Sequence, residues 1–305
     1  MKKLLLIYNP HSGTGKVLQE LPGLLDFYTG QGWLVSIYPT QRQGDCTRLT
    51  REMAGEFDLC VVCGGDGMLH EMAGGLSTAE AAYPMGYIPF GTTNDYANTH
   101  RISRIPLEAA RTTLEGQDVL MDTGLFNEEA FVYVAAFGVA TSVSWATSQE
   151  EKKRWGYLAY VVRGLQSVDF AHWENNSSQM KVIWDQGEVE GDFIFGSISN
   201  SRFIAGMNNF IDERFSCNDG LLEGFFIRRP MNLMELDTIF RSIREKNYDS
   251  DFFVQIQSPW FEIESEPTVW TLDGEYGGEQ QQVTIRTVPR NLSMRLPAVD
   301  AAQEE

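Results

Sequence analysis

A four-residue stretch, Gly64-Gly65-Asp66-Gly67, constrains the fold more than any other feature of the chain. It follows Asp58–Cys63, a short and mostly apolar run that predicts a buried parallel strand. After it, apolar side chains recur at helical spacing from residue 68 to residue 76. A strand, a glycine turn and the start of a helix therefore follow one another directly, which predicts an α/β fold at this point.

The chemistry of this turn favours a phosphorylated ligand with a metal ion. Glycines let the backbone approach a ligand closely, and the free N–H groups at a helix N-terminus favour anions. The carboxylate of Asp66 would repel a phosphate unless a cation lay between them. A nucleotide polyphosphate with Mg²⁺ is the simplest interpretation. A tight strand-to-helix turn without a ligand is the alternative, because short motifs also occur by chance.

Length and charge limit the classes of partner. The chain has 305 residues, enough for a sizeable core and for two domains. Its formal net charge of -18 argues against nucleic acid as a partner, and allows at most transient contact with an anionic membrane surface. The apolar run Leu4–Tyr8 is too short for a signal peptide or a membrane span, so we expect a cytoplasmic protein.

The cysteines predict no metal or redox site. Cys60 and Cys63 have the spacing of a zinc or redox half-site, but residues three apart in a strand point to opposite faces. No second pair accompanies them, and Cys46 and Cys217 are isolated. We therefore expect reduced, structural thiols.

The two halves of the chain have different patterns. Up to about residue 123, apolar runs alternate with amphipathic stretches, which predicts a parallel sheet covered by helices. Residues 124–288 contain many short apolar runs separated by turn residues, which predicts an antiparallel β-sandwich or barrel. Two helices are expected within this half, at about 153–167 and 232–247. The fold class is thus an α/β N-terminal domain, residues 1–123, followed by a C-terminal antiparallel β-sandwich domain.

Two further glycine-containing loops follow predicted strands of the first half. Asn9-Pro10-His11-Ser12-Gly13 does not fit a Walker loop or a dinucleotide fingerprint, so a nucleotide contact and a plain turn both remain open. The segment Phe90–Ala97 again brings glycine and hydroxyl residues to the end of a strand, and Asn94 or Asp95 is suited to cap the next helix.

One amphipathic stretch, Lys152–Leu165, combines basic and aromatic residues. Docking on a membrane is one interpretation. A surface helix that packs its apolar side on the second domain is the other, and the acidic composition of the chain favours it.

The order and spacing of five segments resemble the diacylglycerol kinase catalytic family, in particular the soluble bacterial lipid kinases related to diacylglycerol and sphingosine kinases. The segments are Asn9–Gly13, Gly64–Glu71, Pro89–Ala97, Asn218–Leu222 and Leu272–Glu275. The resemblance covers nearly the whole chain. It implies that the two domains enclose a cleft for ATP, that residues 289–305 return to the first domain, and that a homodimer can form.

The resemblance also implies roles for individual residues. Asp66 would engage the nucleotide through Mg²⁺, and Asp273 and Glu275 would be the catalytic carboxylates. Ser216, Asp219 and Leu221 would hold a structural Mg²⁺. The implied nucleotide contacts are Asn9, Pro10, Ser12, Gly13, Thr40, Gly64, Gly65, Asp66, Gly67, Met68, Glu71, Gly91, Thr92, Asn94 and Asp95.

Two positions depart from the family pattern: Met68 replaces the usual threonine, and His70 replaces a common asparagine. The expected function is an ATP-dependent kinase acting on a lipid hydroxyl such as that of diacylglycerol. The alternatives are a kinase of soluble substrates resembling NAD kinase, and a nucleotide-binding regulatory protein without turnover. The segment Asn218–Leu222 favours the lipid kinases, and the intact carboxylates Asp66, Asp273 and Glu275 argue against loss of turnover.

Overall fold

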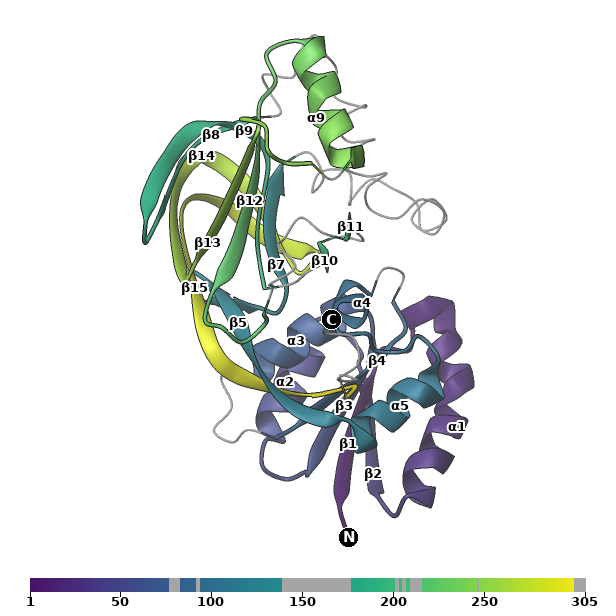
Figure 1. Ribbon diagram of the computed structural model, residues 1–305. Coiled ribbons are helices and arrows are strands. Elements are labelled where there is room, and N and C mark those ends of the chain that lie inside the picture. The colour runs from purple at the N-terminus through teal and green to yellow at the C-terminus, as the bar shows by residue number, and fades with distance from the viewer. Residues whose placement is uncertain are drawn as a thin grey trace. The chain divides into compact units, whose positions relative to one another are not determined.

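The computed structural model describes residues 1–76, 83–91, 94–138, 177–200, 203–204, 207–208, 216–245 and 247–298. The chain divides into two compact units (Figure 1). The first unit is Met1–Met121 together with Arg290–Glu305, and the second is Asp122–Pro289. The boundaries expected from the sequence, after residues 123 and 288, lie within two residues of these.

Parallel strands form the centre of the first unit. They are β1 (Lys3–Tyr8), β2 (Leu34–Pro39), β3 (Leu59–Gly64) and β4 (Met85–Pro89), in the spatial order β4-β3-β1-β2. Every residue of β3 and β4 is buried, whereas β2, at the edge, is only partly covered. A strand that is buried on both faces is usually a continuous apolar run, and β3 and β4 follow this pattern.

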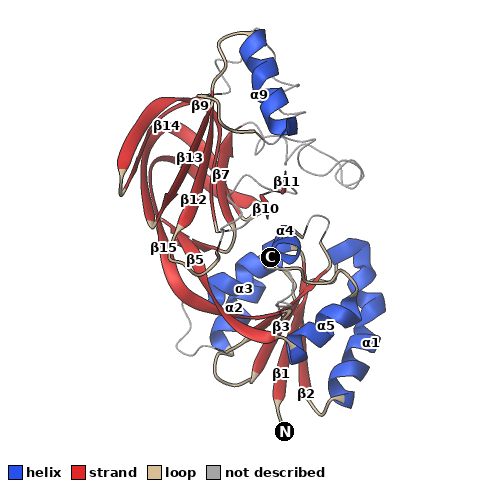
Figure 2. Ribbon diagram, in the orientation of Figure 1, coloured by secondary structure: helices blue, strands red, loops and turns tan. Residues whose placement is uncertain are grey.

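Helices connect these strands and cover the sheet (Figure 2). They are α1 (Lys16–Gly30), preceded by the short 3-10 helix η1 (Ser12–Gly15), then α2 (Asp45–Glu52), α3 (Asp66–Leu76), α4 (Asp95–Thr99) and α5 (Pro106–Glu115). Helix α5 begins at a proline, which lacks the N–H that would have no partner in the first turn.

The second unit is mainly antiparallel. Its strands are β5 (Gln117–Phe126, starting in the first unit), β6 (Glu129–Phe131), β7 (Val134–Gly138), β8 (Ser178–Trp184), β9 (Gly187–Ser199), β10 (Phe203–Ile204), β11 (Met207–Asn208), β12 (Leu222–Arg228), β13 (Phe253–Ser258), β14 (Trp260–Leu272) and β15 (Glu275–Leu296). Helix α9 (Leu233–Glu245) corresponds to the helix expected near 232–247. The other expected helix, near 153–167, lies outside the described residues.

The main sheet of the second unit closes on itself. Strand β9 pairs with both β7 and β8, and β14 pairs with the same two strands, all antiparallel. Each of β9 and β14 has 13 residues, long enough to have different neighbours at its two ends. The two layers expected for a sandwich are therefore continuous with each other. A core that includes Phe137, Phe193 and Trp270 fills this sheet.

The last strand belongs to both units. Strand β15 pairs with β14 in the second unit, and its end returns to the first unit, where Met294 pairs in parallel with Met85 of β4. Arg295 of the same segment forms an ion pair of 2.7 Å with Asp118. Among the described residues, no helix has the length and apolarity needed to cross a membrane.

The cysteines of β3 are structural, as the sequence predicts. Cys60 and Cys63 are both fully buried, because both faces of the central strand are covered. Burial raises the pKa of the Cys60 thiol to about 12. Such a thiol remains protonated and is a poor nucleophile or metal ligand.

Candidate active site

Three loops meet at one edge of the parallel sheet of the first unit. They follow β1, β3 and β4, which are adjacent and parallel, so their carboxyl ends lie side by side. A Cβ built on Gly64 would lie 3.6 Å from Ser12 Oγ, and one built on Gly13 would lie 3.0 Å from the Phe90 carbonyl oxygen. A Cβ on Gly65 would lie 3.3 Å from the Cα of Gly91. In open α/β sheets this edge is where ligands bind.

The glycines of these loops are required by close packing. A Cβ on Gly64 would overlap the side chain of Met68. A Cβ on Gly91 would lie 2.6 Å from Asn94 Oδ1 and 2.7 Å from the Cα of Gly65. The backbone of the second loop therefore contacts that of the third without intervening side chains, which leaves peptide groups as the main surface of this edge.

Asp66 lies where two helices begin. It is the first residue of α3, it is half-buried, and its Oδ1 accepts a hydrogen bond of 3.4 Å from the N–H of Tyr96 in α4. The first N–H groups of α3 have no partner within the helix, so the carboxylate stands next to a cluster of anion-binding donors. This combination suits a phosphate group that is bridged to Asp66 by a cation.

The side chain of Met68 lies beneath the loop and contributes little to its surface. Its side chain is buried, with 7% exposed, and packs against Gly64. Its N–H donates to the Gly65 carbonyl oxygen at 3.0 Å. The side chain at position 68 therefore packs beneath the glycine turn, and its N–H forms part of the turn.

The cap expected from Asn94 is not formed. Asn94 is the N-cap residue of α4 and has a left-handed backbone, with φ of 52°, but its side chain makes no capping hydrogen bond. Its Nδ2 donates instead to the Gly91 carbonyl oxygen at 2.9 Å, and its Oδ1 accepts from the Tyr87 hydroxyl at 3.3 Å. Of the two residues predicted to cap the helix, Asn94 or Asp95, the side chain of Asn94 makes no cap, because its amide is used within the loop. Thr92 and the side chain of Asp95 lie outside the described residues.

The first loop is built around Asn9. Its Oδ1 accepts from the His11 N–H at 2.9 Å, and its carbonyl oxygen accepts from the Ser12 N–H at 3.0 Å. Thr40, which follows β2, donates its N–H to the Tyr8 carbonyl oxygen at 2.9 Å. Asn9, Ser12 and Thr40 thus lie at the same edge of the sheet, and the half-buried Pro10 lies between the first two in the loop.

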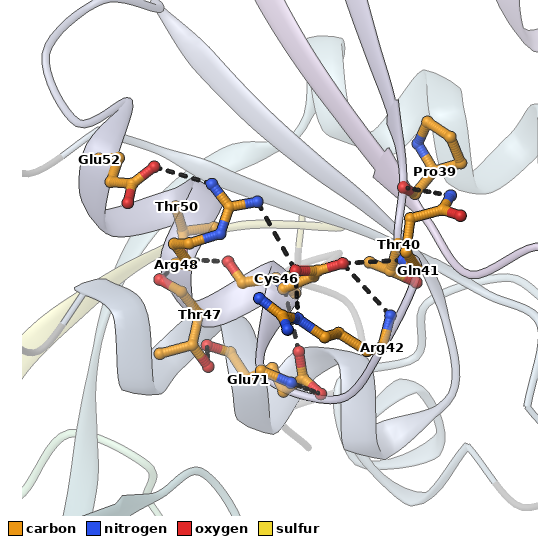
Figure 3. Close-up of polar contacts among 12 residues, drawn as sticks. Pro39, Thr40, Gln41, Arg42, Cys46, Thr47, Arg48, Thr50, Glu52 and Glu71 are labelled. Carbon is orange, nitrogen blue, oxygen red and sulfur yellow. Dashed lines mark hydrogen bonds and ion pairs between the residues drawn. The ribbon is translucent and has the colours of Figure 1, made fainter.

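Glu71 points to helix α2 (Figure 3). Its two carboxylate oxygens accept from the N–H groups of Gly44 and Cys46, each at 3.0 Å. Its carbonyl oxygen accepts from the Thr47 hydroxyl at 2.9 Å. Glu71 therefore caps the N-terminus of α2 from the neighbouring helix, a role that the sequence pattern did not reveal.

Asp45 supports the same helix end. Its Oδ2 accepts from the N–H groups of Gln41 and Arg42 at 2.8 and 3.2 Å. It also forms ion pairs with Arg42 and Arg48. The backbone hydrogen bond from Gln41 is the main cause that lowers the pKa of Asp45.

Asp273 and Glu275 have opposite environments in the second unit. Asp273 and Gly274 form the turn between β14 and β15, with φ of 51° and 90°, as in a tight hairpin turn. Asp273 is 3% exposed, and its carboxylate accepts three backbone N–H groups at 2.7 to 3.0 Å, from Val132, Tyr133 and Val134. Glu275, by contrast, is exposed at the start of β15. The carboxylate of Asp273 is thus held by the backbone, whereas that of Glu275 is open to solvent.

The loop 216–221 is held by a carboxylate that the sequence analysis overlooked. Asp122 is 1% exposed, and its Oδ2 accepts from the Gly220 N–H at 2.7 Å. Asp219 is exposed, and its Oδ1 accepts from the Leu221 N–H at 3.0 Å. The Ser216 hydroxyl donates to Asn218 Oδ1 at 2.8 Å. A lone acid directly after the apolar residues 120–121 was the available signal for Asp122.

A second overlooked carboxyl, Glu223, is buried beside this loop. Its Oε1 accepts from Gln257 Nε2 at 3.3 Å, and its Oε2 has no hydrogen-bond partner. Burial, with a smaller contribution from the charge of Asp219, raises the pKa of Glu223 to about 8.

The donor set of the loop is compatible with Mg²⁺ but is small. Asp219 supplies one carboxylate, and the carbonyl groups of Ser216 and Leu221 could supply neutral oxygens, so water would complete the shell. Mg²⁺ commonly keeps several waters in protein sites. In the part of the chain that the structure describes, no three His, Cys, Asp or Glu side chains form a group that could hold a metal by themselves.

Comparison with known proteins agrees with this geometry. Residues 3–126 match the model of the diacylglycerol kinase catalytic domain. The chain is 28% identical to a diacylglycerol kinase of Bacillus subtilis over 282 residues, which is 91% of both chains. It is 27% identical to one from Staphylococcus carnosus over 281 residues, 91% of this chain and 90% of the relative.

The fold has a solved counterpart. The crystal structure of a diacylglycerol kinase from Bacillus anthracis superposes with a TM-score of 0.80 at 24% identity, over 99% of this chain and 98% of that one. The resemblance found in the sequence motifs is thereby confirmed in sequence and in fold. The chain is similar to bacterial diacylglycerol kinases over most of its length, and its residues 3–126 match the model of the diacylglycerol kinase catalytic domain.

Proposed function

We propose that this protein is an ATP- and Mg²⁺-dependent lipid kinase that transfers the γ-phosphate of ATP to a lipid hydroxyl such as that of diacylglycerol. The observation that carries the proposal is the meeting of three glycine loops at the carboxyl edge of the parallel sheet, with Asp66 at the start of α3. The names of the relatives support the choice of a lipid acceptor.

The first unit would bind the nucleotide. The backbone of Gly64–Met68 would hold the phosphates, and Asp66 would meet them through Mg²⁺, which neutralises phosphate charge when bound. The loops of the other two strands, Asn9–Gly13 and Gly91–Asp95, and Thr40 would complete the contacts. Glu71 would act indirectly, since both of its carboxylate oxygens hold α2.

The second unit would supply the base. Phosphoryl transfer needs a carboxylate that accepts the proton of the attacking hydroxyl. We assign this role to Glu275, because it is exposed and adjoins a rigid turn, whereas the carboxylate of Asp273 is occupied by three N–H groups. Asp273 is then a positioning residue that fixes the turn carrying Glu275.

The structural Mg²⁺ at Ser216, Asp219 and Leu221 remains part of the proposal. So do a cytoplasmic location, transient contact with membrane surfaces, the absence of a nucleic-acid partner and a homodimeric assembly.

The alternatives are a kinase of soluble substrates resembling NAD kinase and a nucleotide-binding regulator without turnover. Both are decided by the same assay.

The test is transfer of label from radiolabelled ATP with Mg²⁺ to dispersed diacylglycerol and other lipids, with NAD assayed in parallel. We expect label in a lipid, and loss of at least about 100-fold in rate for Glu275→Gln and for Asp66→Asn. Glu279→Gln is the matched control, because Glu279 is also exposed on β15. Label in NAD alone, or ATP binding without any transfer, would contradict the proposal. Transfer rates equal to that of the wild type in both Glu275→Gln and Asp66→Asn would overturn the assignment of the active site.

A further inference from the structure

The N-terminal end of α9 exposes a cluster of apolar side chains, which we call the apolar tip: Met231, Leu233 and Met234. Their exposed fractions are 69%, 65% and 82%. Apart from Met1, the other exposed large apolar side chains among the described residues have exposed fractions of 43% to 56% and are mostly scattered singly. A local cluster of this kind marks an interaction site more often than isolated exposed residues do.

The backbone of the apolar tip is fixed by a reciprocal cap. Asn232 Oδ1 accepts from the N–H groups of Met234 and Glu235 at 3.1 and 3.0 Å. The Glu235 carboxylate accepts in return from the Met231 N–H at 2.7 Å and from Asn232 Nδ2 at 2.8 Å. This is similar to a capping box with asparagine in the N-cap position, except that the glutamate accepts from the N–H one residue before the N-cap. The three apolar side chains therefore project from an ordered turn.

The opposite side of the same helix is already used. Ile239 and Ile243 are buried against Phe225, Ile227 and Phe253 of the sheet. The side of α9 that carries Ile239 and Ile243 therefore packs on the sheet without the apolar tip. Packing of α9 against the described strands does not account for the exposed side chains of the apolar tip.

Two basic residues lie close to the apolar tip along a chain that is strongly acidic overall. Arg228 and Arg229 precede the tip with only Pro230 between, and no acidic residue occurs from 228 to 234 in a chain with a net charge of -18. Arg229 pairs with Asp192 at 2.9 Å. Arg228 contacts neutral groups, the carbonyl oxygen of Glu190 and the ring of Phe193. The first acid, Glu235, is engaged in the cap, so the charge of Arg228 complements an anionic surface.

We propose that the apolar tip of α9 docks on the surface of a phospholipid membrane. The apolar side chains would enter the boundary between headgroups and acyl chains, and Arg228 would meet lipid phosphates. Flexible methionine side chains suit a surface that has no fixed shape. A protein partner fits less well, since three side chains fall short of the about 800 Å² per partner of a stable interface. The inference rests on the proposed function in one respect, that the acceptor lipid resides in a membrane.

Cosedimentation with vesicles of phosphatidylcholine and phosphatidylglycerol in equal amounts tests the docking. The variant Met231→Gln/Leu233→Gln/Met234→Gln keeps Asn232 and Glu235, so the cap is intact, which circular dichroism would verify. We expect its partition coefficient to fall at least about tenfold. The control Leu18→Gln/Ile105→Gln/Leu107→Gln removes three exposed apolar side chains from the first unit and should bind as the wild type does. Arg228→Gln should weaken binding only when phosphatidylglycerol is present.

Equal vesicle binding by the wild type and the tip variant would overturn the proposal. So would concentration-dependent self-association in analytical ultracentrifugation that the tip variant abolishes, with no vesicle binding by the wild type. Activity separates this inference from the proposed function. We expect the tip variant to phosphorylate a water-soluble short-chain diacylglycerol at the wild-type rate and to lose activity on long-chain diacylglycerol in vesicles. If the wild type phosphorylates no lipid, the proposed function fails, and sedimentation alone still decides the docking.

Discussion

The two acidic residues of the turn between β14 and β15 show that the same side-chain chemistry can serve different purposes. Asp273 is buried among three backbone donors, so its charge is satisfied within the protein. We expect Asp273→Asn to lower the free energy of unfolding by about 2–4 kcal/mol, because the amide turns a donor toward one of the buried N–H groups. Denaturant unfolding measures this loss. Glu275→Gln should leave stability within about 0.5 kcal/mol of wild type, since the side chain is exposed.

A positioning role also predicts a split in the kinetics. Asp273→Asn should lower kcat by displacing Glu275, and a pH profile of kcat that keeps its wild-type shape would show that the same base operates. Unchanged stability with complete loss of turnover would show instead that Asp273 meets the substrate directly.

His100 predicts a pH dependence of stability. Its ring contacts that of Tyr96 in a tilted arrangement, its Nε2 is buried without a hydrogen-bond partner, and burial lowers the pKa of His100 to about 3. In the unfolded chain the imidazole of His100 is protonated below its ordinary pKa of about 6.5, whereas in the folded protein it stays neutral until near pH 3. The free energy of unfolding therefore falls as the pH falls from 6.5 toward 3. The loss is at most about 2 kcal/mol at pH 5. His100→Phe should lack it. Parallel unfolding curves of both proteins at pH 7 and pH 5 measure the difference, and equal losses would refute the assignment.

At the scale of elements, the strand–turn–helix unit around Gly64–Gly67 was predictable because its signals are local. The apolar run, the glycines and the helical spacing all occur within about twenty residues. The partners of the carboxylates were not predictable. Glu71 caps a helix that begins 26 residues earlier, and Asp273 meets donors about 140 residues away. A motif gives the residue type at a position, but packing of distant elements decides what the side chain contacts.

Helix α2 provides the test of this point. Glu71→Ala removes the acceptor for the Gly44 and Cys46 N–H groups, so we expect a loss of about 1–2 kcal/mol in the free energy of unfolding. Glu52→Ala is the matched control, because its exposed ion pair with Arg48 contributes at most about 0.5 kcal/mol. With the fold intact, the Kd for ATP should change less than about twofold in Glu71→Ala. Loss of ATP binding at unchanged stability would make Glu71 a direct ligand.

At the scale of the whole molecule, the sequence separated an alternating half from a strand-rich half. It did not show that the second half closes through β9 and β14, because pairing at the two ends of a long strand depends on partners far along the chain. The return of β15 to β4 came from the family resemblance, since one pairing between Met294 and Met85 leaves no local pattern.

The loop 216–221 links metal binding to the stability of the second unit. Asp122 fixes the loop from β5 through the Gly220 N–H, and the Asp122 N–H donates in turn to the Cys217 carbonyl oxygen at 2.9 Å. A cation held by Asp219 would stabilise this arrangement in the folded state only. At a Mg²⁺ concentration ten times its Kd, we expect a gain of about 1.4 kcal/mol, seen as a rise in the thermal midpoint without nucleotide. Asp219→Asn should abolish the rise in the thermal midpoint. Asp66→Asn, which alters the proposed nucleotide site in the first unit, should retain it. An equal rise in the thermal midpoint of all three proteins would place the stabilising Mg²⁺ elsewhere. No rise in the wild type would show that the loop 216–221 holds no structural metal. The proposed kinase activity would still be decided by the transfer assay.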